Sequence, residues 1–157
     1  MIKTPRDKSV TRRRDLRTGL ASKSGVAAIE FAILAPILLL IVTGACQFTM
    51  VLGNYMTLEH AAGEGARALA ISRGDSTPVT DSQTQIYSAA GNLTTSNITI
   101  NYSVNGTSCT TDASCSTALS AGVPAQVTAT YPCNLVVMGT DFAPGCMLSV
   151  GATERVE

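Results

Sequence analysis

Residues 31–42 read FAILAPILLLIV and lie in a strongly apolar segment. Residues 31–58 contain no Asp, Glu, Lys, Arg or His. About 20 apolar residues are enough for a helix to cross the hydrocarbon core of a bilayer. Fewer than 100 residues follow the segment, which is too few to bury so uniformly apolar a helix in a soluble core. The sequence therefore predicts one transmembrane helix over residues 26–52.

The charges are divided between the beginning of the chain and the rest. Residues 1–25 carry eight of the eleven Lys and Arg residues against two acids, whereas residues 26–157 carry three against nine. A basic segment before a membrane helix stays in the cytoplasm, so residues 1–25 are predicted to be a basic cytoplasmic leader and the C-terminal part to face outward. The acidic remainder would repel phosphate, which argues against nucleic-acid binding. The basic residues nearest the helix are Arg12, Arg13, Arg14, Arg17 and Lys23.

Three other export segments share this layout. Thr43, Gly44 and Ala45 precede Cys46 and match a signal-peptide or lipoprotein cleavage site only loosely, because the apolar run continues past them. The sequence TRRRDLR at residues 11–17 is similar to a twin-arginine signal, but an aspartate stands where a large apolar residue is usual. Each alternative accounts for fewer residues than the pattern described next.

Gly25 ends the basic segment and is followed by VAAIEF. This order resembles the prepilin cleavage motif of type IV pilins, in which a peptidase cuts after the glycine and a glutamate is the fifth residue of the mature chain. Glu30 stands at that position, Phe31 follows it, and Pro36 is eleventh after the cut. Residues 12–73 are most similar to the TadE/TadG-like minor pilins, or pseudopilins, of tight-adherence (Tad/Flp) type IVb pilus systems.

The resemblance implies a role for each matching position. Prepilin peptidase would cut between Gly25 and Val26. Glu30 and Phe31 would set subunit register during assembly, and Pro36 would kink the helix. The implied partners are this peptidase, the membrane, other pilin subunits and the Tad assembly machinery, in a hetero-oligomer or filament. The implied location is the bacterial inner membrane, with a single pass, a cytoplasmic N-terminus, and assembly into a pilus at the cell surface.

Glu30 is also unusual by itself, because it lies one turn inside an apolar helix start. A charge at the centre of a membrane helix costs roughly 2.5–3.5 kcal/mol, so such residues usually have a partner. Cleavage would create a largely cationic α-amino group on Val26, which could pair with Glu30 of a neighbouring subunit. The simpler alternative is a helix-end carboxylate in the headgroup region, near the positive end of the helix dipole.

Residues 53–73 are predicted to continue the helix as an amphipathic segment. Gly74 is expected to end it. Residues 75–96 are rich in Ser, Thr, Asp and Gln and are predicted to form a loop, with one helical turn around Ile86 and Tyr87. The apolar face of the amphipathic segment is predicted to consist of Met56, Leu58, Ala62, Ala66, Leu69 and Ile71.

Three later segments alternate apolar and polar residues, which is typical of strands with one buried face. Together they predict a small antiparallel sheet packed on the amphipathic helix, in an extracytoplasmic β-rich head over residues 74–157. The predicted fold is thus α+β, with a single long N-terminal transmembrane and stalk helix before a disulfide-stapled head. The inward residues are Ile98, Ile100, Tyr102 and Val104, then Ala125, Val127, Ala129 and Tyr131, then Leu148, Val150 and Ala152.

Four of the five cysteines follow the predicted span, and four cysteines allow three pairings. Cys133 ends the second strand and Cys146 begins the third, so an antiparallel hairpin would bring them together. This favours Cys133–Cys146 and Cys109–Cys115. Closing a loop of about 15 residues contributes on the order of 3 kcal/mol, which matters for a small head. Cys46 lies in the span and is expected to be an apolar thiol without a reactive role.

The sequence contains no recognisable chemistry for catalysis or metal binding. Zinc is disfavoured because no C-x-x-C occurs and His60 is the only histidine. His60 has no plausible nucleophile nearby in the sequence, and neither a phosphate-binding loop nor a nucleophile elbow is present. We therefore expect no enzyme, no cofactor and no metal.

Two functional classes remain open. The first is a prepilin-peptidase-processed minor pilin or pilus assembly subunit of a Tad/Flp adhesive pilus. The second is an uncleaved membrane-anchored extracytoplasmic binding protein. Four glycosylation sequons, at Asn92, Asn97, Asn101 and Asn105, would suit a eukaryotic form of the second class, but they cluster in a tract rich in Ser, Thr and Asn, where chance explains them better.

Overall fold

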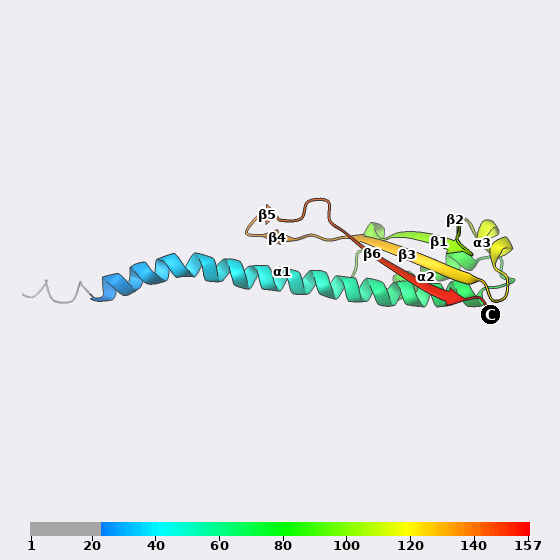
Figure 1. The fold of residues 1–157 in the computed structure, drawn as a ribbon, viewed down its shortest axis with the longest axis horizontal. Helices are drawn as coiled ribbons and strands as arrows, with labels where there is room; N and C mark the ends of the chain where they lie inside the picture. Colours follow the sequence, from blue (N-terminus) through cyan, green and yellow to red (C-terminus); the bar gives the residue numbers. More distant parts are fainter. Residues whose placement is uncertain (1–22) are drawn as a thin grey trace, which may run out of the picture. The chain divides into compact units, whose positions relative to one another are not determined.

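The computed structural model describes residues 23–157 (Figure 1). The predicted basic leader, with Arg12, Arg13, Arg14 and Arg17, lies outside the described residues except for its last three positions. The chain divides into two compact units, residues 1–42 and residues 43–157. The following description takes each unit by itself.

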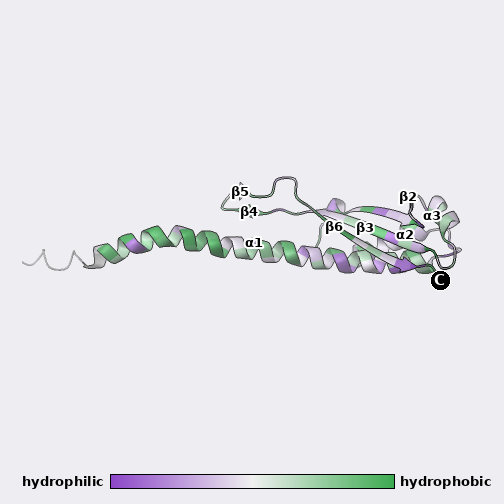
Figure 2. Cartoon of the chain, viewed as in Figure 1, coloured by the Kyte–Doolittle hydropathy of each residue, from purple (hydrophilic) through white to green (hydrophobic). Residues whose placement is uncertain are grey.

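Helix α1, Lys23–Ile71, carries the apolar segment and continues through Pro36 as one α-helix. It is long and apolar enough to cross a membrane, and the side chains of its most apolar window are not buried by the protein. Figure 2 shows hydrophobic colouring concentrated in the N-terminal half of α1. This helix is consistent with a membrane anchor or a signal segment. It ends two residues before Arg73, and Gly74 follows with a φ of 85°, the left-handed conformation that glycine adopts without strain.

The second unit contains a four-stranded antiparallel sheet in the order β2-β1-β3-β6. The three predicted strands are present as β1, β3 and β6, and the fold class is α+β as predicted. Tyr102 of β1 lies opposite Val127 of β3, and Ala129 of β3 lies opposite Val150 of β6. The strand bounds are β1 Thr99–Val104, β2 Thr107–Cys109, β3 Pro124–Pro132 and β6 Met147–Arg155.

One face of this sheet and the C-terminal part of α1 form a common core. Leu58 and Leu69 are fully buried on α1, and the helix positions between them are mostly Ala and Gly. The prediction was wrong for Met56 and Ile71, which are 60% and 62% exposed. Residues two apart on a helix are separated by about 200°, so neither side chain can share the face of the leucine beside it. The sheet contributes Tyr102, Val104, Ala125, Val127, Ala129 and Val150.

A second helix, α2 (Pro78–Ala89), occupies the region predicted to be mostly a loop, and it includes Ile86 and Tyr87, where one helical turn was predicted. It packs closely on α1 at Gly65, where an added Cβ would overlap Cγ1 and Cδ1 of Ile86. The Ser82 hydroxyl, fully buried, donates a hydrogen bond to the Gly65 carbonyl oxygen at 2.8 Å. The absence of a side chain at Gly65 therefore allows the two helices to approach each other.

Strand β2 (Thr107–Cys109) and helix α3 were also not predicted from the sequence. Strand β2 follows β1 through a tight turn at Asn105 and Gly106, whose φ values are 51° and 77°. Helix α3, Asp112–Ala118, begins with a capping box in which Thr111 and Ser114 each accept a hydrogen bond from the other's backbone N–H. The Cys109–Cys115 disulfide joins β2 to α3, with a Cα–Cα distance of 5.2 Å. This is the pairing that the sequence analysis favoured.

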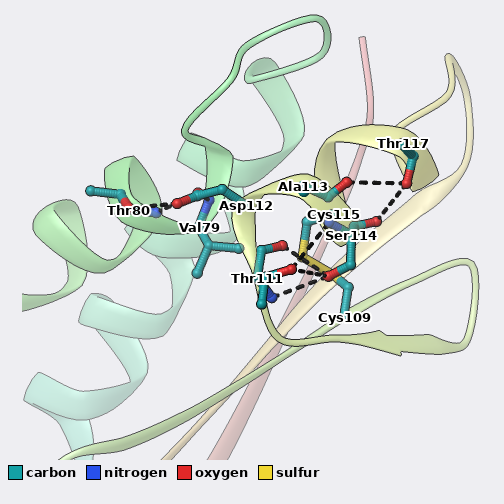
Figure 3. The surroundings of a disulfide bond; sticks show 9 residues. All are labelled: Val79, Thr80, Cys109, Thr111, Asp112, Ala113, Ser114, Cys115 and Thr117. Atoms are coloured by element: carbon teal, nitrogen blue, oxygen red, sulfur yellow. Dashed lines mark hydrogen bonds between the residues drawn. A yellow bond between two sulfur atoms is a disulfide. The ribbon is translucent and has the colours of Figure 1, made fainter.

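Asp112, enclosed by this disulfide, caps helix α2 from a distance in the sequence (Figure 3). Its Oδ1 accepts hydrogen bonds from the backbone N–H groups of Val79 at 2.7 Å and Thr80 at 3.0 Å, and its Oδ2 accepts one from the Thr80 hydroxyl at 2.8 Å. The N-cap residue of α2, Thr77, provides no side-chain cap. Asp112 thus satisfies two of the free N–H groups at the start of α2.

The hydrogen bonds that Asp112 accepts hold its pKa below the ordinary value, and those from Thr80 have the largest effect. A depressed pKa stabilises the fold above the unfolded pKa of about 3.9, and this contribution is lost as the pH falls through the folded pKa.

Asp112→Asn should therefore lower stability at neutral pH, with the difference from wild type shrinking in acid. Urea unfolding of the detergent-solubilised protein at about pH 7 and about pH 3 measures this. Thr80→Val is the comparison, because it keeps the carboxylate and its two backbone donors but removes the Thr80 hydroxyl, so it should show a weaker form of the same pH dependence. An equal deficit for Asp112→Asn at both pH values would contradict the charged cap.

The second disulfide, Cys133–Cys146, closes a hairpin between β3 and β6, as the strand order suggested, with a Cα–Cα distance of 5.3 Å. We call residues 133–146 the stapled hairpin. It contains the short strands β4, Val136–Val137, and β5, Thr140–Asp141, joined by a turn at Met138 and Gly139. Among the cysteines of the described residues, Cys46 alone is a free thiol, with its side chain exposed on α1.

Candidate processing and assembly site

The predicted cleavage residues lie in the first turns of α1. Gly25 and Val26 follow the helix start at Lys23, and a Cβ added at Gly25 would have no atom within 4 Å. Since a protease cleft binds an extended backbone, the first turn of α1 would have to unwind for cleavage after Gly25. Glycine lowers helix stability by about 1 kcal/mol relative to alanine, which reduces the cost of that unwinding.

Glu30 lies one turn after Val26 on the same side of the helix, with its side chain exposed. It forms no ion pair with another described residue. The surrounding side chains are apolar and exposed, including Ile29 at 64% and Phe31 at 70%. A single carboxylate is therefore presented from an otherwise apolar helix surface.

Pro36 lies inside α1, where its ring nitrogen has no hydrogen to donate to the carbonyl oxygen of Ala32. The helix continues through this position, and a kink there stays a prediction. The side chains that follow Pro36 are exposed, as expected for a segment with no protein packed around it. The large exposed residues are Ile37, Leu38, Leu39, Leu40, Ile41 and Val42.

The structure thus gathers Gly25, Val26, Glu30, Phe31 and Pro36 on the first four turns of one helix. The four paired cysteines belong to the second unit and do not contribute to this site. Among residues 23–157, no group of three or more His, Cys, Asp or Glu side chains is arranged to hold a metal ion.

A different kind of candidate is a shallow groove of about 360 Å³ between α2 and the β1–β2 hairpin. Tyr102 lies in it, and burial raises the pKa of this phenol to about 12, against the smaller opposing effect of the Ser82 hydroxyl. The Ser82 proton goes to the Gly65 carbonyl, and the Tyr102 hydroxyl forms no hydrogen bond within the described residues. The other polar side chains of the groove include Gln83 and Tyr87. The residues that line the groove include no histidine, carboxylate, lysine or arginine.

Comparison with known proteins finds one protein family that is similar to part of this chain. The family model for TadE-like proteins matches residues 25–67. No match to a curated protein was found, and none to a solved structure. The matched segment begins at Gly25, contains Glu30, Phe31 and Pro36, and extends through Gly65 into the part of α1 that packs in the core. Residues 25–67 of this chain therefore match the TadE-like protein family.

Proposed function

We propose that this chain is a minor pilin or pilus assembly subunit of a Tad/Flp adhesive pilus, processed by prepilin peptidase. The observation that carries the proposal is the TadE-like match, which begins at the residue after which the pilin motif would be cut. The family relates the chain to Tad pilus systems. Processing, a minor-pilin role and association with other pilins are the proposed refinements.

In this proposal, α1 crosses the bacterial inner membrane once, with its N-terminal end in the cytoplasm. The peptidase cuts after Gly25 and removes the leader that holds eight of the eleven basic residues. The new α-amino group of Val26 has an ordinary pKa of about 7.7–8.0, so it is mostly protonated at neutral pH. Cleavage thus creates a cation one helical turn from Glu30.

The Glu30 carboxylate and this amine would be the main charges in an apolar surrounding. Opposite charges attract more strongly in a medium of low dielectric constant than in water. An unpaired charge there is costly, so packing that brings Glu30 of one subunit to the Val26 amine of its neighbour is favoured over other registers. The pair would set subunit register in the filament or assembly complex.

The two disulfides support an extracytoplasmic head, because disulfides persist in oxidising compartments and are rare in the cytosol. The head contains a sheet stapled at two places, and its described residues include no catalytic pair. These features suit a structural subunit whose head is exposed outside the membrane.

Glu30→Gln tests the pairing, because it keeps the size of the side chain and removes the charge. We expect cleavage to persist and incorporation into sheared pili, or cross-linking to other pilins, to fall to a small fraction of wild type. Glu30→Leu should assemble at least as poorly, although it makes membrane insertion easier. Glu59→Gln is the matched control, since Glu59 is an exposed carboxylate on the same helix beyond the apolar segment.

Wild-type recovery of both Glu30 variants in pili would contradict the pairing and favour a simple headgroup-facing carboxylate. The intact mass of wild-type protein from membranes tests the processing step directly. A mature chain beginning at Val26 is expected. A chain that retains its leader would favour the uncleaved, membrane-anchored binding protein instead.

A further inference from the structure

The stapled hairpin exposes an unusual number of apolar side chains at its tip. Val136, Met138 and Phe142 are 42%, 64% and 59% exposed, and Met147 beside the staple is 54% exposed. Asp141 is the only charged residue in residues 134–147. Its Oδ1 accepts a hydrogen bond from the backbone N–H of Ala143 at 3.0 Å, so its carboxylate is partly satisfied within the hairpin.

The hairpin is closed by backbone hydrogen bonds between its two arms. The Phe142 N–H donates to the Leu135 carbonyl at 3.0 Å, and the Cys133 N–H donates to the Cys146 carbonyl at 3.1 Å. Together with the disulfide, these bonds hold the apolar tip away from the end of the sheet at which β3 ends and β6 begins. Met138 and Phe142 are therefore exposed on a hairpin that is closed by hydrogen bonds and a disulfide.

Within the second unit, the hairpin can be related to the part of α1 that precedes the core. Within the second unit, Figure 1 shows β4 and β5 beyond the end of the sheet, on the side of the α1 residues that precede Leu58. The core contacts of α1 begin at Leu58, so within the second unit the hairpin extends past the sheet beside the α1 residues that precede Leu58. In the same region, Phe48, Met50, Leu52 and Met56 of α1 are exposed.

The length of the uncharged stretch, residues 31–58, indicates where the hairpin lies relative to a bilayer. Residues 31–58 as an α-helix span about 42 Å at 1.5 Å per residue. A bilayer with its headgroup regions is about 40–45 Å thick. With Glu30 inside the inner leaflet, as in the proposed function, Glu59, the next charged residue, lies at or just outside the outer headgroups. An element that extends back from Leu58 along α1 must enter the headgroup region.

We propose that the stapled hairpin is a second membrane contact, whose apolar tip inserts into the interface of the leaflet where the α1 span ends. Apolar and aromatic side chains are stabilised at this boundary, and the near absence of charge in the hairpin removes the main cost of entering it. A soluble protein partner would have to penetrate the headgroups to reach the same side chains. The proposal rests on α1 crossing the membrane, and it requires neither processing nor a pilus.

The chain contains no tryptophan, so a single introduced indole reports its own surroundings. Phe142→Trp and Met138→Trp place it at exposed positions of the tip. The full-length protein is reconstituted in phosphatidylcholine vesicles with and without brominated acyl chains, which quench indole emission by contact. We expect both variants to lose most of their emission in the brominated vesicles. Ile37→Trp, in the apolar segment, is the positive control.

Ala121→Trp is the matched negative control, because Ala121 is exposed near the opposite end of β3, about 30 Å from the hairpin end at 3.3 Å per strand residue. Equal quenching of the tip variants and Ala121→Trp would overturn the proposal. Blue-shifted tip emission that is not quenched, and that grows with the protein-to-lipid ratio, would overturn it in favour of contact with a second copy. Absence of quenching for Ile37→Trp would overturn both the span and the proposal.

The result can be separated from the proposed function. Tip quenching is expected for the cleaved and the uncleaved chain alike, so a failure of prepilin processing would leave it unchanged. Conversely, an unquenched tip in a protein that is cleaved after Gly25 and enters pili would overturn the membrane contact alone.

Discussion

Gly25→Leu is expected to abolish cleavage, leaving a full-length chain of 157 residues in the membrane in place of a 132-residue mature form. Leucine does not disturb α1, since no atom lies within 4 Å of a Cβ at this position. It favours the helix by about 1 kcal/mol over glycine, and this opposes the unwinding that a protease cleft requires. Loss of cleavage would therefore reflect recognition by the peptidase and a stiffer site, without loss of folding.

Gly44→Leu is the matched control for this result. Gly44 lies in the same helix, and a Cβ added there also has no atom within 4 Å. Its substitution adds the same side chain to the apolar segment and should leave cleavage unchanged. Intact mass spectrometry of membrane protein distinguishes the two products by the mass of the leader. Normal processing of Gly25→Leu would reject the prepilin assignment.

Gly65→Val is expected to destabilise the head by about 3 kcal/mol or more, the upper part of the range for overpacked cores. Its Cβ would overlap the fully buried side chain of Ile86. Separation of α1 from α2 would also break the hydrogen bond from Ser82 to the Gly65 carbonyl, which contributes about 1 kcal/mol. Because small domains are stable by only about 5–15 kcal/mol, much of the protein should unfold on mild heating. Thermal or urea unfolding in detergent measures the loss.

Gly63→Ala provides the contrast, because a Cβ at Gly63 has no atom within 4 Å and alanine favours the helix. This variant should be as stable as wild type or up to about 1 kcal/mol more stable. Ile86→Ala should recover part of the stability of Gly65→Val by making room, so the two changes should combine non-additively. Strict additivity, or full stability of Gly65→Val, would show that the helices do not pack as described.

The main strands were predictable because their signal is local. Residues that alternate between apolar and polar define a buried face in β1, β3 and β6 without knowledge of the partner strand. Strand β2 was not predicted, although Asn105 and Gly106 are a strong hairpin signal, because its three residues are too few to show an alternating pattern.

Helix α2 was missed for a different reason. Its composition is that of a loop, and its starting signal is only Pro78 at the first turn. The side chain that caps it, Asp112, lies more than 30 residues later, and its close contact with α1 depends on Gly65. Both stabilising features are tertiary, so the local sequence predicted only one turn, around Ile86 and Tyr87, and not the whole helix.

The candidate site was predictable from the sequence motif alone, and the fold adds little to it. The structure places Gly25, Glu30 and Pro36 on one exposed helix but adds no partner from the described residues, since processing and assembly both involve other molecules. Asp112 and the stapled hairpin show the opposite situation. No motif marks them, and their roles follow from hydrogen bonds and exposure that only the folded chain has.

The small side chains on the buried face of α1 also have a mechanical consequence. Between Leu58 and Leu69 this face is formed mainly by Ala61, Ala62, Gly65 and Ala66, which make it nearly smooth. A force along the helix axis is resisted by large interlocking side chains and by hydrogen bonds between the helix and its neighbours. The two leucines and the Ser82 hydrogen bond are the points at which α1 would transmit axial force to the head. Truncating either leucine would weaken the resistance of the head to shear along the helix, in addition to leaving a cavity.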